Sequence, residues 1–133
     1  MFRGRLSVTL YVYDIPESVD FYRWAFNFSF DGYWNPETGQ MTDDWAQSGM
    51  PSYVELRAGE NIIALQKVDE VCESARAEFR LEVIDIEGFY NHVCESGAEP
   101  GELTCEEGYW KMFTVSDPNG YTWQFCKQLK FGE

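Results

Sequence analysis

The chain has 133 residues, 44% of them hydrophobic and 17% aromatic, and this length and composition predict one domain, residues 1–133, with a packed core. No stretch approaches the roughly 18 consecutive apolar residues of a membrane span, and no signal-peptide apolar region opens the chain, so we expect a cytoplasmic protein. The net charge of −13, from 23 acidic and 10 basic side chains, disfavours nucleic acid and membranes as partners and favours a cation, although excess acid also serves solubility alone.

The first half of the chain begins with a strand and a helix. Residues 6–13 alternate aliphatic with more polar side chains, which predicts a half-buried strand with an inner row of Leu6, Val8, Leu10 and Val12. Pro16 suits a first helical turn, and apolar residues then recur at helical spacing, which predicts an amphipathic helix ending near Asn27. Strands are expected over 28–34, 52–58 and 61–67, a long loop over 35–51, and a hairpin at Gly59-Glu60.

The second half repeats this order. The junction Leu10–Ile15 recurs as Leu81–Ile86, an offset of 71 residues (85 − 14). A strand is predicted over 78–84, a helix from Ile86 with Gly97 as its stop, and strands near 102–106, 109–116 and 121–127. The chain therefore predicts an α+β fold of two βαβββ modules, residues 5–68 and 77–129.

Two motifs carry a family resemblance. Residues 12–22 read VYDIPESVDFY, and residues 113–121 read FTVSDPNGY, in which Asp-Pro-Asn-Gly also favours a tight turn. Together with the doubled module order, they resemble the vicinal oxygen chelate superfamily of glyoxalase I, extradiol dioxygenases, and fosfomycin- and bleomycin-resistance proteins. The resemblance implies curved sheets that enclose a cleft, often completed by dimerisation, so a homodimer is expected.

The resemblance also implies where chemistry would occur. Family metalloenzymes bind a divalent metal through the first and last strands of each module, at places that correspond here to Ser7, Gln66, Glu78 and Gln124. Only Glu78 carries a charge, and no histidine lies in a predicted strand. Divalent cations favour imidazole or anionic oxygen ligands, so we expect no metal, no cofactor and no catalytic residue.

Alternation along the strands predicts which side chains face the cleft. Trp34, Trp45 and Trp110 are candidates for a ligand wall, since a flat cation stacks on aromatic faces beside acids, although large aromatics also serve as core. Arg80 lies between two acids and either neutralises them or anchors a substrate. Tyr121, Trp123 and Phe125 fall on the opposite, helix-packing face. The predicted ligand-binding residues are Tyr11, Trp34, Trp45, Gln66, Glu78, Arg80, Glu82, Trp110, Met112 and Gln124.

Other constellations point to no further chemistry. The four cysteines, Cys72, Cys94, Cys105 and Cys126, are widely spaced and are predicted to be free thiols. His92 is predicted to be a surface residue of the second helix. There is no P-loop or G-x-S-x-G motif.

The leading hypothesis is a metal-independent binder of the bleomycin-resistance type, with a role in antibiotic resistance. It would sequester a cationic, partly aromatic small molecule in a cleft at a dimer interface. The alternatives are a glyoxalase-like metal lyase or dioxygenase with an atypical ligand set, a metal-free catalyst using Glu78, or a non-catalytic interaction module.

Overall fold

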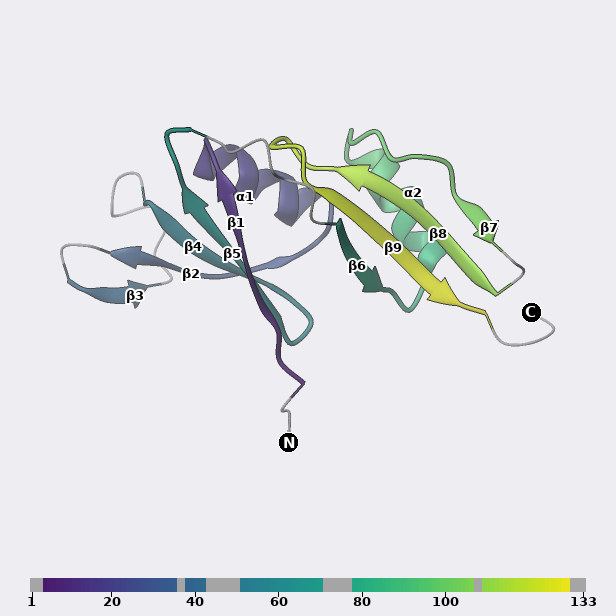
Figure 1. The fold of residues 1–133 in the computed structure, drawn as a ribbon, viewed down its shortest axis with the longest axis horizontal. Helices are drawn as coiled ribbons and strands as arrows, with labels where there is room; N and C mark the ends of the chain where they lie inside the picture. Colours follow the sequence, from purple (N-terminus) through teal and green to yellow (C-terminus); the bar gives the residue numbers. More distant parts are fainter. Residues whose placement is uncertain (1–3, 36–37, 43–50, 71–77, 107–108, 130–133) are drawn as a thin grey trace. The chain divides into compact units, whose positions relative to one another are not determined.

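The computed structural model describes residues 4–35, 38–42, 51–70, 78–106 and 109–129. The chain divides into two compact units, Met1–Cys72 and Glu73–Glu133, each with one helix and one mixed β-sheet (Figure 1). This confirms the predicted α+β class. Within the described residues, no helix is long and apolar enough to cross a membrane.

The first unit has a five-stranded sheet in the order β1-β5-β4-β2-β3. The chain order is β1 (Ser7–Val12), α1 (Ile15–Trp24), β2 (Ser29–Asn35), β3 (Gln40–Thr42), β4 (Tyr53–Ala58) and β5 (Asn61–Lys67). β1 and β5 run parallel and the remaining pairs are antiparallel. Helix α1 packs against β5, β2 and β4, so one face of the sheet is covered by the helix.

The second unit has a four-stranded sheet in the order β6-β9-β8-β7. Its elements are β6 (Glu78–Glu82), α2 (Ile86–Glu95), β7 (Thr104–Glu106), β8 (Trp110–Ser116) and β9 (Thr122–Gln128). β6 and β9 run parallel, and α2 packs against β8 and β9. This is the predicted βαβββ order.

Several predicted boundaries need correction. Residues 40–42 were expected to lie in a loop but form β3, because the chain turns at Gly39, which has a φ of 68°, and pairs back along β2. A strand of three residues is too short to show a period. Helix α1 ends at Trp24 rather than near Asn27, which adopts the expected left-handed conformation with a φ of 59°.

Two strands are also shorter than predicted. Leu6 was placed on the inner face of the first strand, but it precedes β1 and is 62% exposed. β6 ends at Glu82 rather than at residue 84, because the chain must turn there to enter α2, and Ile84 is 93% exposed.

The core of each unit lies between its helix and its sheet. In the first unit, Tyr22 of α1 is fully buried and stacks on Phe28 with ring centroids 5.7 Å apart. In the second, Phe125 is fully buried, and its ring centroid lies 4.7 Å from that of Phe89. Tyr121 and Trp123 are also buried, as the alternation predicted.

Both helices begin at the aspartate of the repeated junction. The Asp14 carboxylate accepts a hydrogen bond from the Glu17 N–H at 3.0 Å, and Asp85 accepts one from the Gly88 N–H at 3.0 Å. Each side chain therefore satisfies an N–H group that has no partner within the helix.

We expect Asp14→Ala and Asp85→Ala each to lower the free energy of unfolding by about 1 kcal/mol, because each removes a helix N-cap. Urea denaturation followed by circular dichroism measures both effects. Asp14→Asn and Asp85→Asn, which keep a capping oxygen, serve as controls and should lose less. Equal losses for alanine and asparagine would contradict the capping role.

Candidate functional site

Each sheet has one face that its own helix does not cover, and these helix-free faces hold most of the predicted site residues. On the first sheet, strand pairing sets the side chains in rows that run across the strands. Tyr11 of β1 pairs with Gln66 of β5, which pairs with Tyr53 of β4. Trp34 of β2 shares their face, because the residue before it, Tyr33, pairs with the residue after Tyr53, Val54. Met41 of β3 pairs with Trp34. We call this row the aromatic row after its three aromatic members, Tyr11, Tyr53 and Trp34.

A second row, the floor row, runs beside the aromatic row. It consists of Thr9, Ala64, Glu55 and Gly32, in register across β1, β5, β4 and β2. Ala64 is fully buried and Gly32 has no side chain, so Glu55 has a small neighbour on either side. Residues two apart on a strand lie about 7 Å from each other, which is the separation of the two rows. The helix-free face of the first sheet thus sets one carboxylate among small residues beside aromatic rings.

Tyr53 and Glu55 interact directly on this face. Partial burial raises the pKa of the Tyr53 hydroxyl, and the charge of Glu55 and a hydrogen bond to its carboxylate raise it further. The Tyr53 hydroxyl therefore stays neutral beside the Glu55 carboxylate.

Strand register changes one of the four positions that the family resemblance implied. Ser7 pairs with Ile62, whereas Gln66 lies four residues further along β5 and pairs with Tyr11. Gln66 donates hydrogen bonds to the carbonyls of Ser52, at 3.1 Å, and Lys67, at 3.3 Å.

The second sheet shows which residue is equivalent. Glu78 pairs with Thr122, and Gln124 lies two residues beyond that partner. The same step from the Ser7 partner, Ile62, leads to Ala64. By register, the position equivalent to Gln124 is therefore Ala64, two residues before Gln66, whose role in ligand binding stays a prediction.

On the helix-free face of the second sheet, hydrogen bonds link side chains of three neighbouring strands. Arg80 Nε donates to Gln124 Oε1 at 2.5 Å, and Gln124 Nε2 donates to Met112 Sδ at 3.4 Å. Glu78 and Glu82 flank Arg80 and are exposed, as the alternation predicted. In the described part of the chain, ion pairs join Arg57 to Asp31 and Lys111 to Glu87, and Arg80 takes part in neither. Arg80 therefore bonds to an amide rather than neutralising the acids beside it.

The structure also describes most of the other residues that the sequence singled out. Trp110 is half-buried, and its position on β8, two residues from Met112, puts it on the helix-free face. Trp45 lies outside the described residues, as does Cys72. Cys94 and Cys105 are exposed free thiols, and His92 is exposed on α2, as predicted. Burial raises the pKa of the Cys126 thiol, an effect that the charge of Arg80 opposes and that of Glu82 reinforces.

Sequence reasoning missed Tyr53, Glu55 and Met41. Period-two alternation along residues 53–58 sets Tyr53 and Glu55 on the face opposite the buried Val54 and Leu56, so this signal was present. Met41 had no such signal, since β3 forms only through pairing with β2.

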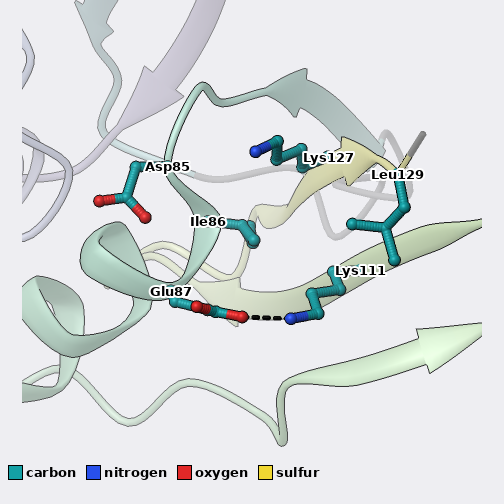
Figure 2. A pocket seen from close by; sticks show the side chains of 6 residues that line it. All are labelled: Asp85, Ile86, Glu87, Lys111, Lys127 and Leu129. Carbon is teal, nitrogen blue, oxygen red and sulfur yellow. Dashed lines mark hydrogen bonds and ion pairs between the residues drawn. The ribbon is translucent and has the colours of Figure 1, made fainter. Parts of the chain in front are cut away.

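A separate hollow of about 220 Å³ lies on the helix side of the second sheet, beside the start of α2 (Figure 2). Its lining residues are Asp85, Ile86, Glu87, Lys111, Lys127 and Leu129. Lys111 reaches across it to form an ion pair with Glu87, which raises the pKa of Lys111. Two acids and two bases line the hollow, so their charges cancel.

The donor atoms do not fit a resident divalent metal. The positions that correspond by strand register hold a hydroxyl and a methyl group in the first unit, Ser7 and Ala64, and a carboxylate and an amide in the second, Glu78 and Gln124. One anionic oxygen without imidazole is a poor set for such an ion. Within the described residues, no group of three or more His, Cys, Asp or Glu side chains is placed to hold a metal.

Comparison with known proteins settles the family. A family model of the Glyoxalase/Bleomycin resistance protein/Dioxygenase superfamily matches residues 5–125. The chain belongs to this superfamily. It is the superfamily that the two sequence motifs resemble, so that interpretation is confirmed. No curated protein sequence matches the chain.

Many solved structures share the fold of this chain. TioX from Micromonospora sp. ML1 matches with a TM-score of 0.75 and 18% identity, over 95% of this chain and 99% of TioX. TnmS3, an antibiotic binding protein from Streptomyces sp. CB03234, matches with a TM-score of 0.70 and 12% identity, over 96% and 98% of the two chains. A glyoxalase/bleomycin resistance protein/dioxygenase from Nocardioides matches with a TM-score of 0.68 and 16% identity, over 96% and 85%. At these identities the likeness concerns the fold.

Proposed function

We propose that the protein is a metal-independent binder that sequesters a cationic, partly aromatic small molecule without transforming it. The ligand would bind the helix-free faces of the sheets, in a cleft at the interface of a homodimer. The observation that carries this proposal is the donor set at the four positions that correspond by strand register, where Ser7 and Ala64 stand in the first unit and Glu78 is the one anion in the second.

The chemistry of the ligand follows from charge and from aromatic side chains. The net charge of −13 attracts cations and repels nucleic acid and anionic membranes. Tyr11 and Trp34 on the first sheet are exposed aromatic residues, at 52% and 39%. A cation on an exposed aromatic face gains about 0.5–1 kcal/mol. TnmS3, whose fold is similar, is an antibiotic binding protein, which supports a small-molecule ligand here.

Isothermal titration calorimetry against a panel of cationic aromatic compounds tests the proposal. We expect at least one cation, such as the dye proflavine, to give saturable heat with a fixed stoichiometry. Its neutral parent ring, acridine, should bind more weakly, since it lacks the charge. The absence of saturable heat across the whole panel would overturn the proposed function.

Metal removal separates binding from metal catalysis. Dialysis against EDTA is expected to leave the affinity for proflavine unchanged, because no bound metal would contribute to the site. Elemental analysis of protein produced with Ni, Zn, Fe or Mn in the medium provides the control. Stoichiometric metal that EDTA removes together with binding would instead favour the glyoxalase-like or dioxygenase alternative.

A further inference from the structure

The geometry points to Glu55 as the carboxylate that recognises the positive charge of the ligand, in a subsite walled by Tyr53 and Trp34. This inference rests on the proposed function and names the polar group that decides its specificity. It assigns the positively charged end of the ligand to the first sheet.

Glu55 is half-buried in the sheet, and its cross-strand neighbours are small. β4 is the central strand of the five, and the cross-strand neighbours of Glu55 are Ala64 and Gly32. Neither neighbour has a side chain long enough to cover the carboxylate. At Gly32, an added Cβ would lie 3.1 Å from the Thr42 carbonyl oxygen and 3.5 Å from the Met41 methyl carbon, so both border the subsite on the β3 side.

The basic residue closest to Glu55 along β4 pairs with another carboxylate. The nearest basic side chain on the same face of β4 is Arg57, two residues along the strand. Arg57 Nε instead pairs with Asp31 Oδ2 at 3.2 Å. Asp31 lies at an irregularity in the pairing of β2 with β4, between Phe30 and Gly32. Among the described residues, no Lys, Arg or His forms an ion pair with Glu55.

The neighbours of Glu55 fit a cation attached to a flat ring. The Tyr53 hydroxyl beside the carboxylate is neutral, so it does not cancel the charge of Glu55. Tyr53 and Trp34 lie one row away from Glu55, with their backbones about 7 Å along the strands. An ammonium, amidinium or guanidinium group would meet Glu55 while the ring that bears it stacks on the aromatic row.

The second sheet lacks this arrangement. There the corresponding row is Arg80, Gln124 and Thr114, so register sets Thr114 at the position equivalent to Glu55. A positively charged residue, Arg80, occupies the edge of that row. The charged residue of this row is therefore negative in the first sheet, Glu55, and positive in the second, Arg80. Of the two described rows, the first is the one that offers a carboxylate.

The test compares Glu55→Gln with Glu60→Gln in the full chain. Glu60 is exposed in the turn between β4 and β5, so its substitution removes the same charge away from the subsite. Fluorescence titration with proflavine and with acridine gives the affinities. We expect Glu55→Gln to weaken proflavine binding about tenfold or more, as loss of a charge-assisted hydrogen bond predicts, and to leave acridine binding unchanged. Glu60→Gln should change neither.

Each other outcome has a definite meaning. If the wild-type protein binds proflavine and the two variants match it, Glu55 does not recognise the cation, while the proposed function stands. If the wild-type protein binds no cation of the panel, the proposed function fails and the Glu55 subsite fails with it. Glu55→Asp keeps the charge on a shorter side chain and should bind proflavine more tightly than Glu55→Gln. A Glu55→Asp variant as weak as Glu55→Gln would contradict a role for the charge, provided that both variants retain the wild-type melting temperature.

Discussion

Replacing Phe125 with alanine is expected to lower the free energy of unfolding by about 3–5 kcal/mol, the range for removing a buried phenylalanine. Phe125 of β9 is fully buried on the face of the sheet against which helix α2 packs. Its ring centroid lies 4.7 Å from that of Phe89, in an edge-to-face contact, and 5.5 Å from that of Phe113. Alanine would leave a cavity that these rigid rings cannot fill by small movements.

Urea denaturation followed by tryptophan fluorescence measures this loss, since Trp123 stacks on Phe125 in the same strand. Tyr109→Ala is the matched control, because Tyr109 is an aromatic residue of the same unit that is 50% exposed. We expect the control to change stability by no more than about 0.5 kcal/mol. Similar losses for the two variants would show that Phe125 does not anchor the core.

Asp117→Ala is expected to cost about 2–4 kcal/mol, because it leaves two backbone N–H groups without their acceptor. Asp117 is 6% exposed, and its Oδ1 accepts hydrogen bonds from the N–H of Asn119 at 2.9 Å and of Tyr121 at 2.8 Å. These bonds close the turn between β8 and β9, in which Gly120 has a φ of 91°. The Asp-Pro-Asn-Gly motif is therefore a turn whose aspartate is structurally required.

Thermal and urea denaturation of Asp117→Ala and Asp117→Asn test this role. Asparagine retains an oxygen acceptor without the charge, so it should lose less than alanine. Asn119→Ala removes a neighbouring side chain of the turn but keeps the backbone N–H group that Asp117 binds. A loss for Asp117→Ala no larger than for Asn119→Ala would contradict the hydrogen-bond explanation.

Local features of this fold could be read from the sequence because their signals are local. The alternation in residues 6–13 identifies β1 with its buried Leu10 and Val12, and the repeated aspartate marks the start of both helices. Such patterns arise within a single strand or helical turn, where side-chain direction depends on backbone period alone. The same reasoning placed Glu78, Arg80 and Glu82 on one face of β6.

The candidate site was predicted less completely, because it depends on which residues lie opposite each other. Gln66 was taken as the partner position of Ser7, but pairing of β1 with β5 sets Ala64 at the place equivalent to Gln124. A count along the sequence cannot supply register, since a shift of two residues keeps every side chain on the same face. The hydrogen bond from Arg80 to Gln124 joins residues 44 positions apart and had no sequence signal.

By itself, the sequence determined the duplicated α+β architecture and the superfamily, because these follow from short periods and motifs, and it predicted a poor donor set at the positions that the resemblance implies. Tertiary structure decided the rows across each sheet. It placed Glu55 between Ala64 and Gly32 beside an aromatic row, and it paired Arg57 with Asp31 instead. Those relations arise from strand pairing between distant segments, where neighbours are chosen by backbone hydrogen bonds rather than by proximity along the chain.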